Sequence, residues 1–159
     1  QFSSLSLAIL LVVLIVGLML KSLKKGIYAT VPIIATIIIL FGFMGYTGIA
    51  LDVATVLVAS IALGMGIDYS IHIITHFYND LKITRNIKKA INETIMISGK
   101  AIIINVASVA AGFLVLTFLH IVPIRNFGLL VALSMIGSGF AALTILPVIL
   151  IIATNKQNK

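Results

Sequence analysis

Long apolar segments separated by short polar links constrain this chain more than any other feature of its sequence. A helix needs roughly 20 apolar residues to cross a bilayer, and five segments meet that need, near residues 4–21, 27–46, 51–77, 100–119 and 127–153. Only 9% of the residues are charged, whereas soluble domains contain about 25%. The sequence therefore predicts an all-α membrane protein, a bundle of five transmembrane helices, and excludes a water-soluble globule.

The distribution of basic residues predicts how the bundle lies in the membrane. One side holds only Arg125, and the opposite side holds ten basic residues: Lys21, Lys24, Lys25, Lys82, Arg85, Lys88, Lys89, Lys100, Lys156 and Lys159. By the positive-inside rule, the basic links and the C-terminus face the cytoplasm in a multi-pass protein of the cell membrane. The net charge of +7 is thus a signal of topology, and we expect no nucleic-acid partner.

The segment 79–99 is the only substantial polar link. Isoleucine recurs within it every four residues, at Ile87, Ile91 and Ile95, while the lysines lie mostly on other faces. This pattern fits an amphipathic helix in the cytoplasmic membrane interface and a short solvated connector equally well.

The chain begins at Gln1, without a methionine or a basic region ahead of its first apolar segment. We therefore expect residues 1–159 to be a membrane-domain fragment of a longer protein rather than a chain that opens with a signal peptide. The sequence has no cysteine, which excludes disulfides and thiolate metal sites.

A single carboxylate, Asp68, lies deep inside an apolar segment. It belongs to a polar stripe at intervals of four residues, formed by Ser60, Gly64, Asp68, His72 and His76. Each interval drifts only about 40° around a helix, so the stripe stays on one side. Ionisable residues inside membrane segments mark ion paths more often than packing sites. We therefore predict that Asp68 carries protons, charged in one state and neutral in another; the alternative is a permanently hydrogen-bonded acid that fixes helix packing.

Two neighbours of Asp68 leave alternatives open. Tyr69 lies about 100° from Asp68 around the helix, and it either hydrogen-bonds an acid on a facing helix or fills space. His72, one turn from Asp68, either relays protons near neutral pH or packs as an ordinary histidine, and packing is slightly favoured.

The next apolar segment offers a second polar face, with Asn105, Ser108 and Gly112 spaced three and four residues apart. These groups either stabilise the Asp68 carboxylate or hold the helices together without a role in transport. At the outer end of the Asp68 segment, Asp52 either caps the helix or collects cations, and capping is favoured. The three histidines lack carboxylate partners for a metal, so we expect neither a metal nor a cofactor.

The run 61–72, with Gly-Ile-Asp-Tyr at residues 66–69, resembles the Asp-Tyr helix of resistance–nodulation–division transporters of the MMPL type. The segments 99–102, 112–116, 123–130 and 146–147 resemble the same family. The resemblance implies an exporter of two similar halves, of which this chain is the five-helix block of one. It implies that Asp68 and Tyr69 lie on the proton-relay helix and face the matching helix of the other half.

The same resemblance implies proton-driven export of lipids or other hydrophobic compounds, and no enzymatic activity. The other half and the extracytoplasmic domains are the implied partners, and the segments 99–102 and 123–130 look more like the C-terminal half. The five-helix block is also similar to sterol-sensing domains, which implies lipid sensing or binding without pumping. A third class, a subunit that aids protein export, uses related halves. The Asp-Tyr pair favours the proton-driven exporter.

Overall fold

The computed structural model describes residues 2–157, and every element in that range is a helix. The elements are α1 (Phe2–Met19), α2 (Leu23–Thr47), α3 (Val53–Thr84), α4 (Ile87–Thr94), η1 (Ile95–Gly99), α5 (Lys100–Leu114), η2 (Val115–Phe118) and α6 (Val122–Gln157).

Four helical runs among the described residues are long and apolar enough to cross a membrane, namely Leu23–Thr47, Val53–Thr84, Ile87–Phe118 and Val122–Asn155. In α1, the stretch Leu10–Met19 adds a shorter apolar helix. The predicted all-α membrane bundle is confirmed.

Local sequence explains where α2 ends and α3 begins. Gly48 follows α2 with a φ of 69°, a conformation that glycine adopts without strain, and its N–H donates to the Met44 carbonyl. Asp52 precedes α3, and its Oδ1 accepts the Thr55 N–H at 2.8 Å. The Asp52 N–H in turn donates to Thr55 Oγ1 at 2.8 Å. This reciprocal pair is a capping box, so Asp52 caps α3, as the sequence favoured.

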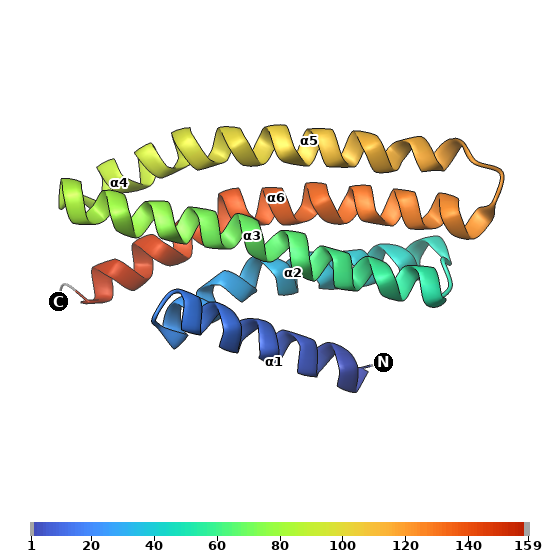
Figure 1. Ribbon diagram of the computed structural model, residues 1–159, viewed down its shortest axis with the longest axis horizontal. Coiled ribbons are helices and arrows are strands. Elements are labelled where there is room, and N and C mark those ends of the chain that lie inside the picture. The colour runs from blue at the N-terminus through green and yellow to red at the C-terminus, as the bar shows by residue number, and fades with distance from the viewer. Residues whose placement is uncertain (1, 158–159) are drawn as a thin grey trace.

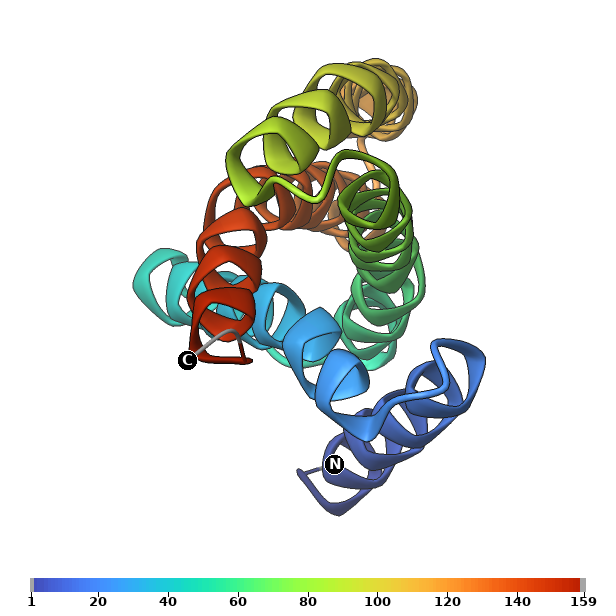
Figure 2. The same cartoon turned by 90° about the vertical axis from the view of Figure 1, so that its left-hand side faces the viewer.

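The central helix of the bundle is α6, which contacts α2, α3 and α5. Viewed end-on, α2, α3 and α6 lie around one axis, with α5 on one side and α1 on the other (Figure 2). Buried side chains fill the interior in two main clusters. One includes Ile73, Phe77, Leu146 and Leu150, and the other includes Leu40, Val58, Leu130 and Met135.

The turns that follow α1 and α3 lie at the same end of the bundle as the C-terminal end of α6 (Figure 1). In or beside these two turns the chain carries Lys21, Lys24, Lys25, Lys82, Arg85, Lys88 and Lys89. Lys100 lies further along, at the start of α5. Lys156 and Lys159 fall outside the side chains that the structure describes.

The polar link 79–99 is helical nearly throughout. After a turn at Arg85, which has a φ of 51°, one continuous helical run passes through α4, η1, α5 and η2. Ile87 and Ile91 pack against the buried cluster that contains Phe77. The apolar side of α4 therefore lies against protein. Its place in the membrane interface or in a solvated connector stays a prediction.

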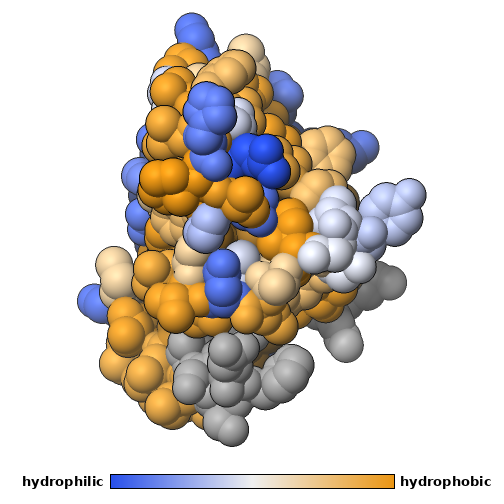
Figure 3. All heavy atoms as spheres, turned by 90° about the vertical axis from the view of Figure 1, so that its right-hand side faces the viewer, coloured by the Kyte–Doolittle hydropathy of each residue, from blue (hydrophilic) through white to orange (hydrophobic). Residues whose placement is uncertain are grey.

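Large apolar side chains cover much of the outside of the bundle. Leu18, Ile38 and Ile103 are 70%, 66% and 60% exposed, and the end-on surface is mostly apolar (Figure 3). Apolar patches of this extent mark surfaces that meet a membrane or a partner. This exterior suits lipid rather than water.

Candidate functional site

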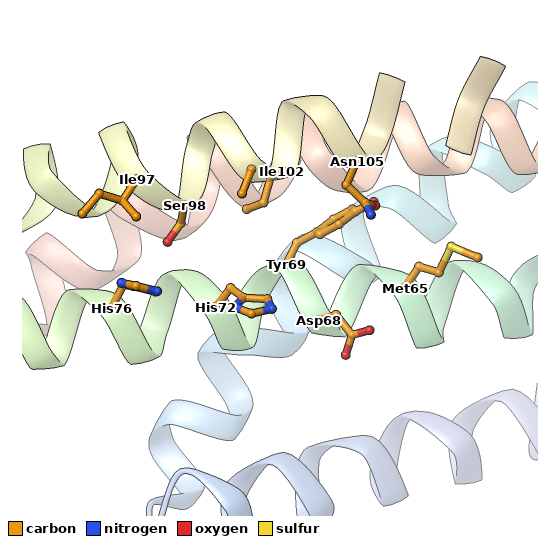
Figure 4. Close-up of a pocket in the computed structure, with 10 residues that line it drawn as sticks. Met65, Asp68, Tyr69, His72, His76, Ile97, Ser98, Ile102 and Asn105 are labelled. Carbon is orange, nitrogen blue, oxygen red and sulfur yellow. The ribbon is translucent and has the colours of Figure 1, made fainter. Parts of the chain in front are cut away.

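A groove of about 480 Å³ lies between α3 and the neighbouring run of η1 and α5. Its polar lining residues are Asp68, Tyr69, His72, His76, Ser98 and Asn105 (Figure 4). The first four come from α3, where intervals of four residues keep three of them on one side of the helix. Asp68, the predicted proton-carrying residue, thus lines the same groove as polar residues from a second helix.

Tyr69 links the two walls of the groove. Its ring is buried, and its hydroxyl donates to Asn105 Oδ1 at 2.8 Å. The sequence left open whether Tyr69 bonds a facing helix or fills space. In this structure it bonds a facing helix, but its partner is an amide rather than an acid.

Asp68 points the other way. Its side chain is exposed, and the carboxylate is directed away from Asn105 and α5 (Figure 4). Three other members of the stripe, Ser60, Gly64 and His72, are also exposed, while His76 is half-buried. These side chains form an open face of α3.

The three residues of the second predicted polar face, Asn105, Ser108 and Gly112 in α5, have different surroundings in the structure. Asn105 lines the groove, whereas the exposed Ser108 hydroxyl donates to the Ile104 carbonyl of its own helix at 2.9 Å. Gly112 has open space beside it, since a Cβ built there would meet no atom within 4 Å. Asn105 alone of these three residues therefore belongs to the groove that Asp68 lines.

Sequence reasoning did not single out Ser98. Its side chain is 4% exposed, and its Oγ has no hydrogen-bond partner among the described residues. It lies in η1, a π-helical turn, and such turns are rare and often occur at functional sites. One signal was available: Ser98 precedes Asn105 by seven residues, which puts both on the same side of a regular helix.

Metal binding has no support from the described part of the chain. Within residues 2–157, no group of three or more histidine, aspartate or glutamate side chains converges on a point that could hold an ion. The polar side chains that line the groove can donate and accept hydrogen bonds.

Comparison with known proteins identifies the family. Residues 3–159 match the sequence model of the MMPL family. A protein of Methanocaldococcus jannaschii named as a membrane protein, MJ1562, is 31% identical over 128 residues, which are 80% of this chain and 33% of that protein.

Two relatives from Mycobacterium tuberculosis are more distant. MmpL12, named as a transport protein, is 28% identical over 104 residues, 65% of this chain and 9% of that protein. The sulfolipid-1 exporter MmpL8 is 23% identical over 118 residues, 74% of this chain and 11% of that protein.

This chain therefore corresponds to a minor part of each relative's length. No solved structure gives a significant match. The family match covers nearly the whole chain, and together with the apolar helices it makes this a transporter-like domain of a multi-pass membrane protein. The resemblance first drawn from the Asp68–Tyr69 helix is confirmed: the chain belongs to the MMPL family.

Proposed function

We propose that this chain is the five-helix membrane block of one half of a proton-driven exporter of lipids or other hydrophobic compounds. The observation that carries the proposal is Asp68, an acid in the middle of an apolar membrane span, beside a groove lined by five further polar residues. Keeping an ionisable group at such a depth is costly, so it is retained where ions move. The name of the relative MmpL8, a sulfolipid-1 exporter, supports a lipid as cargo.

Asp68 and Tyr69 are the proposed relay residues, and their different surroundings suit different roles. Asp68 is exposed on an open face of α3. Tyr69 is held by Asn105, which fixes its ring against the wall of the groove. His72 and Asn105 line the same groove as Asp68 and Tyr69 and are the proposed supporting residues of the relay.

The other half of the transporter is the proposed partner of the open face. Ser60 and Gly64 are small and exposed, on the same side of α3 as Asp68, and small residues allow two membrane helices to approach closely. A second block packed there would cover the Asp68 carboxylate and exclude lipid from it.

The proposed orientation places the basic turns after α1 and α3 in the cytoplasm, because positive residues are retained on that side. Protons then move inward towards this end of the bundle. One elementary charge that crosses the membrane field releases about 2.3 kcal/mol per 100 mV. Repeated protonation of Asp68 can therefore drive a change in how the two halves pack, which moves the cargo outward.

The test is Asp68→Asn in the full-length protein, reconstituted in vesicles with an imposed pH gradient. Asparagine keeps the shape of the side chain but cannot carry a proton, so proton-coupled transport is lost while membrane insertion stays normal. Asp52→Asn is the matched control, because it makes the same change on the same helix and asparagine still caps α3. Transport at the wild-type rate in Asp68→Asn would reject the relay.

A further inference from the structure

The helical run from Ile87 to Phe118 is the least buried of the four long apolar spans. Only 11% of the residues in its most apolar stretch are buried, whereas the corresponding shares in the other three spans are 44–50%. Its α5 part lies at the outside of the bundle (Figure 2), and the side chains of Met96, Ile103 and Ile104 are 68%, 60% and 58% exposed. An apolar surface of this kind meets either lipid or another protein.

A second groove, of about 360 Å³, lies on this surface between α6 and the run of η1 and α5. Lys100 is its one charged lining residue. The other lining residues are apolar or glycine, namely Ile95, Met96, Gly99, Ile103, Ile104 and Leu143. The second groove shares no lining residue with the groove that Asp68 lines.

Lys100 lies at the level where the hydrocarbon core of a membrane would end. Beyond it, away from the basic end of the bundle, α5 and η2 contain 15 and 4 residues. They extend about 30 Å, at about 1.5 Å per residue in an α-helix and 2.0 Å in a 3-10 helix, which is about the thickness of the hydrocarbon core. Side chains on a helix lean towards its N-terminal end, which for α5 is the basic end. The exposed Lys100 side chain therefore reaches towards the lipid phosphates at that end.

The elements that form the second groove offer no negative charge to Lys100. The segments η1, α5 and α6 contain no acidic residue, and Glu93 lies seven residues earlier, or about 10 Å along the helix. A second copy of the chain, packed through the same surface in the same orientation, would bring no acid to this level. The anion that a membrane itself supplies at this level is the phosphate of a lipid headgroup.

We propose that the second groove binds an anionic phospholipid from the leaflet at the basic end of the bundle. Its phosphate lies at the Lys100 ammonium, and one acyl chain follows Ile103 and Ile104 deeper into the membrane. Basic pockets between membrane helices on the cytoplasmic side bind anionic headgroups in this way. A lipid bound here contacts η1, the turn that also contributes Ser98 to the groove lined by Asp68. The inference does not depend on the proposed proton relay.

Quenching of tryptophan fluorescence by brominated lipids tests the site, and this chain contains no tryptophan of its own. The reporter is Ala107→Trp in the full-length protein, with any tryptophans outside this chain replaced by phenylalanine. Ala107 is exposed, lies one turn beyond Ile103, and does not line the groove. The protein is reconstituted in phosphatidylcholine vesicles that contain either brominated phosphatidylglycerol or brominated phosphatidylcholine. We expect phosphatidylglycerol to bind beside the reporter about fivefold more tightly, equivalent to about 1 kcal/mol for one lysine.

Two charge variants and a second reporter separate this site from the surrounding lipid. Lys100→Gln keeps most of the side chain without its charge, so it should abolish the preference for phosphatidylglycerol. Lys24→Gln is the matched control, because it removes an exposed lysine of α2 that does not line the groove, and it should keep the preference. Ile38→Trp, on the exposed apolar side of α2, reports on lipid elsewhere and should be quenched equally by both lipids.

Each contrary outcome has a definite meaning. Equal quenching by the two lipids at Ala107→Trp, or a preference that survives Lys100→Gln, would overturn the proposal. If neither lipid quenches Ala107→Trp while both quench Ile38→Trp, then protein covers the groove, as a second copy or the other half, and the proposal is also wrong. None of these outcomes bears on the Asp68→Asn experiment, so the two proposals fail independently.

Discussion

At the scale of single residues, Asp68 and Tyr69 are neighbours in sequence with opposite surroundings. The rotation of about 100° per residue places Asp68 on the open face of α3 and turns Tyr69 into the bundle. There the Tyr69 hydroxyl donates a hydrogen bond to Asn105 Oδ1 at 2.8 Å. The sequence placed the two side chains on different sides of the helix. It did not predict Asn105 as the partner of Tyr69, because that contact depends on how α5 packs against α3.

The hydrogen bond between Tyr69 and Asn105 predicts coupled effects on stability. Such bonds between membrane helices contribute on average about 0.6 kcal/mol and at most about 1.7 kcal/mol. We expect Tyr69→Phe and Asn105→Ala each to lower the free energy of unfolding, and the double variant to lower it by less than the sum. The measurement is equilibrium unfolding of the full-length protein in mixed detergent micelles.

Ser108→Ala is the control for this comparison of single and double variants. The Ser108 hydroxyl bonds to the Ile104 carbonyl of its own helix, so its effect and that of Tyr69→Phe should be additive. Additive effects in the Tyr69 and Asn105 pair would show that the bond does not stabilise the fold.

At the scale of elements, the packing of α1 on α2 depends on one glycine. A Cβ added to Gly26 would come within 2.7 Å of the Val13 carbonyl oxygen and within 2.9 Å of the Gly17 nitrogen. Both atoms belong to the backbone of α1, which cannot yield as a flexible side chain can. The sequence shows the small residues but not which of them lies at a crossing, since Gly42, Gly45 and Gly64 have open space around them.

We expect Gly26→Ala to force α1 away from α2 and to destabilise the protein by about 1–3 kcal/mol, the usual cost of overpacking. Gly45→Ala is the matched control on the same helix, because a Cβ there meets no atom within 4 Å. The thermal unfolding midpoint in detergent measures the stability of both variants. Equal midpoints for the two variants would contradict the close crossing.

Two prolines lie inside helices, and the structure tolerates both. Pro32 is buried in α2, and the Thr36 hydroxyl donates to its carbonyl at 2.9 Å. Pro147 lies in α6, which changes direction in its C-terminal part (Figure 1). A proline removes one backbone hydrogen bond and bends the helix.

At the scale of the whole molecule, the bundle leaves its polar stripe uncovered. Ser60, Gly64, Asp68 and His72 are all exposed on α3, although most of the remaining exterior is apolar. A polar face that meets lipid is costly, since lipid supplies no hydrogen bonds. The open face is therefore the surface where we propose that the other half packs.

Gly64→Leu tests this packing. A larger side chain fits within the block itself, because nothing lies within 4 Å of a Cβ at Gly64. We expect it to push the two halves apart at a cost of about 1–3 kcal/mol and to lower transport sharply. Gly42→Leu, at another open position, should leave transport unchanged. Transport assays in vesicles compare the two, and wild-type activity in Gly64→Leu would place the interface elsewhere.

The sequence alone determined the class of fold, the approximate positions of the apolar segments and the single deep acid, because these follow from hydropathy, charge and helical periodicity along the chain. It also identified the family, from the residues around Asp68. Only the tertiary structure decided that Tyr69 bonds Asn105, that α4 packs on protein and that Ser98 lines the groove. Each of these depends on how the helices pack against one another in space, and the place of Ser98 depends also on the π-helical turn at Ile95–Gly99. Local spacing along the chain encodes neither.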